Sequence, residues 1–135
     1  MKKIFVFFIL FLFYSVLIAN ENNSHVNLFV AAQNDKIIYS MGEGTVIKVG
    51  YNPEQGNYIK ARYSEYNITI TYCNLSKIAV QKGHKIWRGT RLGFVGRTGN
   101  IKETGVTIII ETEENGMIIN RNDMDIPNII HLFDK

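Results

Sequence analysis

Along most of the chain, short apolar runs alternate with turns rich in Gly and Asn. No long stretch repeats apolar residues at the period of about 3.6 that marks an amphipathic helix. Runs of this length, bounded by turn residues, predict an all-β domain. The expected strands are Val26–Ala31, Ile37–Tyr39, Gly44–Val49, Asn57–Arg62, Asn67–Cys73, Arg91–Val95, Val106–Thr112 and Met117–Asn120.

Two of these strands carry more specific patterns. Between residues 68 and 73, Ile and Tyr alternate with Thr and Cys, which is typical of a strand with one buried face. Residues 106–110 are almost wholly apolar, so this strand is expected at the centre of the sheet with both faces covered. The strands at 57–62 and 67–73 are close enough in sequence to form a hairpin across residues 63–66.

The two ends of the chain have their own patterns. Lys2 and Lys3 precede an apolar run, Ile4–Ala19, after which the chain turns polar. This run is shorter than the roughly 20 residues of a membrane-spanning helix. It predicts a signal peptide at residues 1–19 or, if uncleaved, an anchor through residues 4–19, followed by a domain at 20–135.

Near the C-terminus, a turn at Glu114–Gly116 is expected before the last strand. Beyond it, Pro127 is placed to begin a short helical tail. The apolar residues that follow Pro127, Phe133 among them, are expected to pack back on the sheet.

Charge is distributed unevenly along the chain. Residues 77–102 hold seven Lys and Arg and no acidic residue, whereas residues 103–135 hold seven acidic residues and two basic ones. Such polarity suits binding of an anionic wall polymer or an acidic protein, and equally suits a solvated loop face. The candidate basic binding loop comprises Lys82, Lys85, Arg88 and Arg91. Nucleic acid is a poor candidate partner because an exported protein seldom meets it.

Two single residues have alternative interpretations. Cys73 is the one cysteine, so it forms no internal disulfide, and its strand position favours core packing over an intermolecular bridge. Trp87 lies between Gly83 and Gly89. We expect it to plug the core beneath this loop, and the alternative is a stacking platform for a sugar or peptide.

Three stretches together resemble the lysostaphin-type (LytM-domain) zinc endopeptidases, which cut peptide cross-links in bacterial cell walls. They are Tyr72–Ser76, the glycine-spaced block from Val80 to Gly99, and Thr104–Glu111. The family reads Tyr-x-His-Leu-Ser, Val-x-x-Gly-x-x-Val-x-x-Gly-x-x-Ile-Gly with Gly-x-Thr-Gly, and Thr-Gly-x-His-Leu-His-Phe-Glu in the same order. The resemblance implies a lysostaphin-like antiparallel β-sheet core of the duplicated-hybrid-motif type over roughly residues 25 to 120.

The family's functional positions are mostly changed. Its three zinc ligands fall on His25, Phe29 and Ile109, and its two assisting histidines fall on Asn74 and Thr107. Hydrocarbon side chains cannot bind zinc, and an amide cannot shuttle a proton near neutral pH. Neither His84 nor His131 has a closely spaced partner, and Glu111 matches a family glutamate that is not a ligand. We therefore expect no metal, no cofactor and no enzymatic activity.

The function expected from the sequence is that of a non-catalytic pseudo-peptidase in the periplasm or cell envelope, released or anchored to the inner membrane. Its degenerate groove of His25, Asn74, Thr107 and Ile109, or the basic loop, would bind peptidoglycan or a cell-wall amidase or other hydrolase. Two alternatives remain open: an active zinc endopeptidase with a non-standard ligand set, and a structural envelope protein tethered to the membrane.

Overall fold

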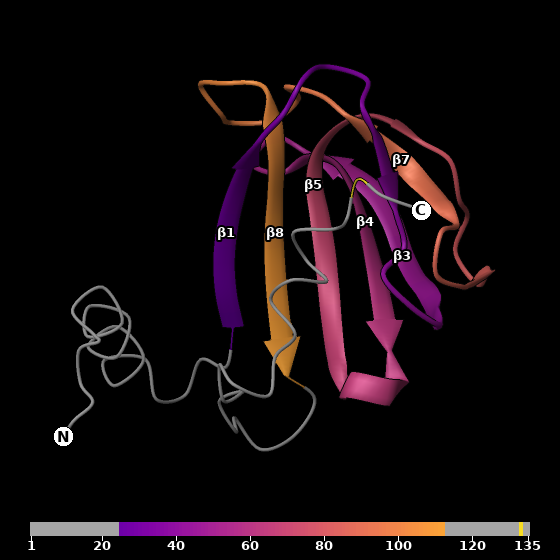
Figure 1. Ribbon diagram of the computed structural model, residues 1–135. Helices are drawn as coiled ribbons and strands as arrows, with labels where there is room; N and C mark the ends of the chain where they lie inside the picture. The colour runs from indigo at the N-terminus through magenta and orange to yellow at the C-terminus, as the bar shows by residue number, and fades with distance from the viewer. Residues whose placement is uncertain (1–24, 113–132, 134–135) are drawn as a thin grey trace, which may run out of the picture.

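The computed structural model describes residues 25–112 and Phe133, and the regular secondary structure of residues 25–112 is β-strand apart from one 3-10 turn (Figure 1). Its elements are β1 His25–Ala31, β2 Ile37–Tyr39, β3 Gly44–Asn52, β4 Gly56–Tyr63, the 3-10 turn η1 Ser64–Tyr66, β5 Ile68–Ile78, β6 Lys85–Ile86, β7 Arg91–Val95 and β8 Gly105–Thr112. The predicted strands within these residues are confirmed, and so is the hairpin, which turns through η1 between β4 and β5. The two-residue strand β6 is an addition to the prediction.

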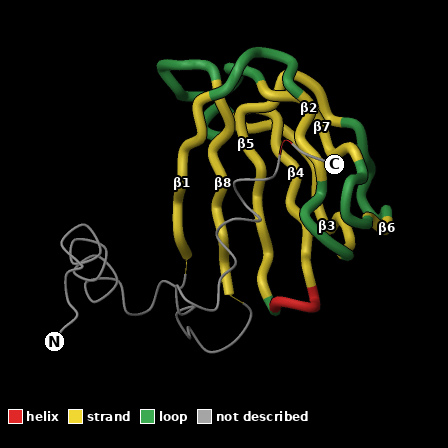
Figure 2. The backbone as a smooth tube through the Cα atoms, viewed as in Figure 1, coloured by secondary structure: helices red, strands yellow, loops and turns green. Residues whose placement is uncertain are grey.

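Every strand pair is antiparallel, and the main sheet runs in the order β1-β8-β5-β4-β3-β6. Strand β7 pairs with the end of β5 and with β2. The two ends of the main sheet, β1 and β6, are therefore far apart, as Figure 2 shows.

The core lies on one face of the sheet, where the apolar side chains of β4, β5 and β8 meet those of β2 and β7. Its fully buried members include Ile38, Ile59, Ile70, Leu75, Leu92, Val95, Ile108 and Ile110. Side chains on the β1 strand alternate in the same way, so Val26, Leu28 and Val30 pack partly buried against this cluster. The period-two pattern of the sequence thus turns one face of the sheet into the core.

Burial of the two central strands differs from the expectation. Strand β5 is buried on both faces, because Thr69 and Thr71 are nearly as buried as Ile70 between them. Strand β8 has one fully buried face, whereas Thr107 and Ile109 on the other are only half-buried. The prediction that β5 has one open face and β8 none is therefore wrong. Coverage depends on the neighbouring strands, which the local pattern does not contain.

A chain of hydroxyl groups crosses the core. The hydroxyls of Tyr63 and Tyr72 are 2.7 Å apart, and that of Tyr63 lies 3.2 Å from the Ser40 hydroxyl. Each buried hydroxyl thereby has a hydrogen-bonding partner. Burial raises the pKa of Tyr63 and raises that of Tyr72 further, because a phenolate would be poorly solvated there.

Several predictions lie outside the described residues: the signal peptide or anchor at 1–19, the turn at Glu114–Gly116, the strand at Met117–Asn120 and the helix beginning at Pro127. Phe133 is described, and it packs partly buried against the core as expected. The Lys36 Nζ atom lies 5.4 Å from the centre of its ring. Within residues 25–112 and Phe133, no helix has the length and apolar character needed to cross a membrane.

Candidate functional site

Asn74 occupies a bend in β5 that the backbone itself creates. Its φ angle is 69°, in the left-handed region where Asn is one of the better tolerated residues. The Asn74 backbone N–H donates to the Gln55 carbonyl at 2.7 Å. The bend therefore turns the Asn74 side chain toward the loops that flank the sheet instead of along the strand.

The Asn74 side chain joins three segments of the chain. Its Nδ2 donates to the carbonyls of Thr98, at 2.8 Å, and Gln55, at 3.3 Å. Its Oδ1 accepts a 2.6 Å hydrogen bond from the Thr107 hydroxyl. Two predicted groove residues, Asn74 and Thr107, are thus in direct contact. The amide is engaged in fastening the β3–β4 turn, the loop after β7 and strand β8 together.

Thr98 completes this junction, and we did not single it out from the sequence. Its hydroxyl donates to the Leu75 carbonyl at 2.8 Å and accepts from the Asn57 backbone N–H at 3.1 Å. Gly56 packs so closely here that a Cβ atom on it would lie 2.5 Å from the carbonyl carbon of Thr98. The Gly-x-Thr-Gly motif at residues 96–99 was the signal that could have identified this role.

Phe29 lies beside the Asn74 junction. In the register of the sheet Phe29 pairs with Thr107, which pairs in turn with Cys73 on the next strand. The Phe29 ring covers Gly105, where an added Cβ would be 2.5 Å from the ring's Cζ. The side chain remains 42% exposed. An aromatic surface therefore stands at the position where the family has a carboxylate ligand.

His25 and Ile109 lie farther along the same face. Ile109 pairs with Asn27, whereas His25 pairs with Glu111 at the far end of β1. His25 and Phe29 are four positions apart on an unbroken strand, a distance of about 13 Å between their Cα atoms. The structure thus brings together Asn74, Thr107 and Phe29, places Ile109 next to them, and leaves His25 apart.

Glu111 has a structural partner. Its Oε1 lies 3.4 Å from the Lys60 Nζ. Lys60 pairs with Thr71 on one side of β5, and Glu111 pairs with Thr69 on the other. The ion pair therefore spans β5 and helps to explain why the Thr side chains beneath it are buried.

The side chains at the family's metal-binding positions do not fit a zinc ion. Phe29 and Ile109 have no side-chain atom that can bind zinc. The oxygens of Asn74 and Thr107 are hydrogen-bonded to each other, because the Thr107 hydroxyl donates to Asn74 Oδ1. His25, the remaining imidazole, is too far from this group. Among the described residues, no cluster of three or more His, Cys, Asp and Glu side chains could hold a metal ion. No catalytic step through zinc can be derived from this arrangement.

Cys73 packs in the interior, as expected. It is 1% exposed, and burial raises the pKa of its thiol to about 12. The thiol is therefore protonated at neutral pH and is poorly suited to act as a nucleophile.

The predicted basic loop is on the surface, and Trp87 is there with it. Lys82, Lys85, Arg88 and Arg91 are all exposed. Trp87 is 56% exposed, so the prediction that it plugs the core is wrong. Ile86, the residue before it, fills that place and is fully buried. Trp87 follows directly after the end of β6, and its side chain is exposed to solvent.

A family model described as "Peptidase family M23" matches residues 23–121, which is most of the chain. The chain therefore belongs to peptidase family M23, and its resemblance to the lysostaphin-type peptidases is confirmed.

Individual relatives and solved structures support the same family. The peptidoglycan DD-endopeptidase ShyA of Vibrio cholerae is 36% identical over 67% of this chain and 20% of its own length. The crystal structure of a zinc containing peptidase from Vibrio cholerae superposes with a TM-score of 0.59 at 25% identity, covering 74% of this chain and 30% of that one. The catalytic domain of lysostaphin from Staphylococcus simulans gives 0.59 at 19% identity, over 68% of each chain, which shows the shared fold. The chain spans about a fifth of the length of the curated relatives it matches.

These relatives correct one expectation. The expectation that the domain has no enzymatic activity is contradicted, because the chain belongs to a peptidase family and its relatives ShyA, ShyB and ShyC are named peptidoglycan DD-endopeptidases, which are enzymes. The loss of ligand types at two of the family's three zinc-binding positions, Phe29 and Ile109, does not by itself show that activity is absent.

Proposed function

We propose that this domain binds peptidoglycan in the bacterial cell envelope, and that it takes the peptide part on the face around Phe29. The observation that supports this most is the exposed aromatic ring beside half-buried Thr107 and Ile109, in a domain of a family whose named relatives act on peptidoglycan. An aromatic side chain offers a large apolar surface at little conformational cost. It suits a short peptide with aliphatic side chains.

The neighbouring junction contributes rigidity to this face. Because Asn74 and Thr107 are tied to each other and to two loops, strand β8 beneath Phe29 is held in place. A preorganised surface loses less entropy when a peptide binds to it.

Co-sedimentation of the full chain with purified peptidoglycan sacculi tests the proposal. We expect the wild type to sediment with sacculi, and Phe29→Ala to weaken binding about tenfold. Tyr51→Ala is the matched control, because Tyr51 is an aromatic residue that is 63% exposed on another part of the domain. Absence of sedimentation, or equal binding by wild type and Phe29→Ala, would count against this face.

Regulation of a cell-wall hydrolase can be measured in the same system. Wall digestion by an amidase from the same organism is followed with wild type and with Phe29→Ala. If binding at this face regulates the amidase, only the wild type changes the rate of digestion.

The second candidate is a zinc-dependent peptidoglycan endopeptidase, which is favoured by the names of the relatives. It requires ligands other than those at the family's positions. Stoichiometric zinc in the purified protein, together with cleavage of muropeptides that a chelator abolishes, would support it. Binding to sacculi without zinc and without cleavage would oppose it.

A further inference from the structure

A second surface lies at the other end of the sheet from Phe29. It consists of Trp87 with the four exposed cations Lys82, Lys85, Arg88 and Arg91, and is referred to below as the Trp87 patch. Strand β6, which ends just before Trp87, closes the strand order opposite β1 (Figure 2). The two surfaces are therefore separated by the width of the sheet.

The turn that carries Trp87 is held firmly. The Trp87 backbone N–H donates to the Thr90 hydroxyl at 2.9 Å, and the Thr90 N–H donates back to the Trp87 carbonyl at 2.9 Å. Gly89, with a φ of 87°, donates to the Ser40 carbonyl at 3.0 Å. Trp87 is thus exposed on a turn whose backbone is fixed by hydrogen bonds.

The strand before the turn is anchored as well. Gly44 and Thr45 of β3 pair with Ile86 and Lys85 of β6. The Gly83 N–H donates to the Val46 carbonyl at 2.7 Å, and the Val46 N–H donates to the His84 carbonyl at 2.9 Å. The cations therefore project from a backbone that is hydrogen-bonded to β3.

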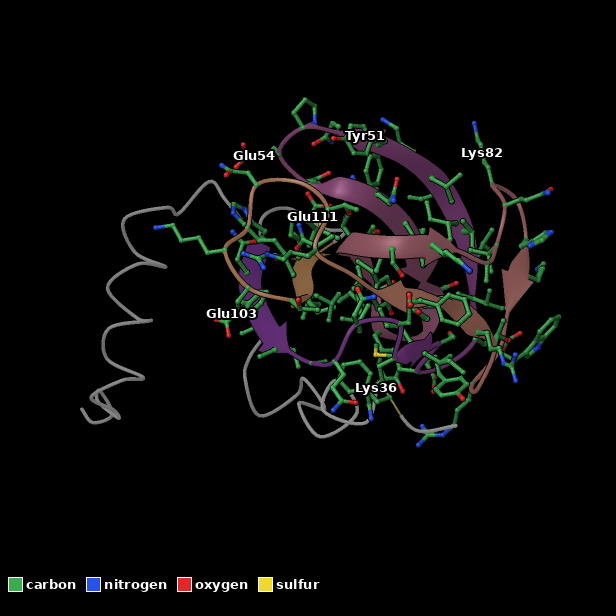
Figure 3. All side chains as sticks on the ribbon, turned by 90° about the horizontal axis from the view of Figure 1, so that it is seen from above. Lys36, Tyr51, Glu54, Lys82, Glu103 and Glu111 are labelled. Atoms are coloured by element: carbon green, nitrogen blue, oxygen red, sulfur yellow. The ribbon has the colours of Figure 1, made fainter. Side chains whose placement is uncertain are left out.

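The charges of the patch are available to a ligand. None of its four cations makes an ion pair with a described residue, although Arg88 donates to the Met41 carbonyl at 3.4 Å. Glu43 precedes β3 but lies outside ion-pair distance of them. Figure 3 shows Lys82 on the side of the molecule opposite Glu54 and Glu103. The four cations therefore give this end of the sheet a local positive charge.

We propose that the Trp87 patch binds an anionic glycan, namely a peptidoglycan glycan strand whose stem peptides have been removed and whose carboxylates are free. A tryptophan face attracts the weakly positive C–H face of a sugar ring, and Lys and Arg pair with carboxylates. An exposed tryptophan on a turn flanked in sequence by Lys82, Lys85, Arg88 and Arg91 favours a ligand that combines sugar rings with negative charge. This inference extends the proposed function to a second part of the same polymer.

Trp87 reports on its own binding site, because it is the only tryptophan in the chain. The full chain is titrated with soluble peptide-free glycan strands, with a synthetic stem peptide and with polyglutamate, while Trp87 emission and its quenching by iodide are recorded. We expect the glycan alone to shift the emission to shorter wavelength and to reduce quenching at least twofold. No change with the glycan, or the same change with polyglutamate, would overturn the proposal.

Variants separate this surface from the one around Phe29. Trp87→Ala and the double variant Lys82→Gln/Lys85→Gln should each weaken glycan binding about tenfold and leave stem-peptide binding unchanged. Tyr51→Ala removes an exposed aromatic ring, and Lys48→Gln/Lys102→Gln removes two lysine charges, at other exposed positions; both should change glycan binding less than twofold. Equal loss in both sets would indicate general charge attraction and would refute the proposal. Failure of Phe29→Ala to affect peptide binding bears only on the first surface.

Discussion

At the scale of single residues, Asn74 has the greatest structural consequence. Asn74→Ala removes the side-chain N–H groups that donate to the Gln55 and Thr98 carbonyls and the oxygen that accepts from the Thr107 hydroxyl, while the backbone N–H of residue 74 still donates to the Gln55 carbonyl. Buried groups left without partners are destabilising, so we expect the free energy of unfolding to fall by about 3 kcal/mol. Urea denaturation followed by circular dichroism measures this change.

The control for Asn74→Ala is Asn27→Ala, since Asn27 is exposed on β1. It should change the free energy of unfolding by less than about 0.5 kcal/mol. A loss of under about 1 kcal/mol for Asn74→Ala would show that the junction is not required for stability.

Sequence reasoning at this scale succeeded where the role of a residue is local. Gly99 has a φ of 84°, as its turn requires, and Cys73 is buried as its strand position indicates. It failed for Trp87, because nothing in a glycine-rich loop tells whether Ile86 or Trp87 faces the core. It also missed Thr98, whose partners Leu75 and Asn57 are distant in sequence.

At the scale of elements, the turn between β3 and β4 depends on Gly56. Its φ is 68°, and a Cβ atom there would meet the Thr98 backbone. Gly56→Ala combines left-handed strain with a backbone clash, and we expect a loss of about 3 kcal/mol or more in thermal or urea unfolding.

Gly83→Ala is a matched control for Gly56→Ala. Gly83 also has a positive φ, 93°, but a Cβ atom there would have no neighbour within 4 Å. Only the backbone strain remains, which corresponds to about 1 kcal/mol. Equal losses in the two variants would mean that contact with Thr98 is not the cause.

Strand β5 should be the most protected element in hydrogen exchange. It pairs with β4 and β8 on its two sides, and both of its faces are buried over residues 68–75. Its amides should exchange only on global unfolding, whereas those of β1, at the end of the described sheet, should exchange at least about tenfold faster. Exchange monitored by mass spectrometry or NMR tests this order, and uniform rates would contradict it.

Strand positions were predictable because period-two patterns and turn residues are local, and the bounds of β2 and β7 match the expected ranges. Strand β6 escaped notice because two residues cannot show a period. The sequence predicted one open face for β5 and none for β8, and the structure has the reverse. The second face of β5 is covered by the Lys60–Glu111 ion pair, whose residues are 51 positions apart in sequence, so no local pattern reveals it.

At the scale of the whole molecule, the core should lose stability in alkali. The pKa of Cys73 is raised from 9.0 to about 12, so above pH 9 the unfolded chain releases a proton that the folded chain retains. The protonated Cys73 thiol therefore makes its full contribution to the unfolding free energy below pH 9, and this contribution is lost as the pH rises from 9 toward 12. Tyr63 and Tyr72 act in the same direction at higher pH.

Cys73→Ala isolates the thiol from the two tyrosines, which both proteins share. Between pH 8 and pH 10, the wild type should lose about 1.4 kcal/mol more unfolding free energy than the variant. Urea titrations at the two pH values measure the difference. Equal losses would show that the thiol does not contribute.

The family and its fold were recognisable from the sequence because glycines, Thr98 and Tyr72 serve the scaffold whatever the site contains. Enzymatic activity was not predictable in the same way. The expectation that it is absent depended on the ligand positions alone, and the names of the relatives contradict it. The separation of Phe29 from Trp87 also required the strand order, which brings segments together that are distant in the chain.

The outward position of Trp87 has a practical consequence for anyone who denatures this protein. Its indole is already largely in water in the native state, so its emission maximum should move little when the chain unfolds. A melting curve recorded at that wavelength would look flat and could be mistaken for a chain that never folded. Far-ultraviolet dichroism, or the signals of the interior tyrosines, would reveal the true transition.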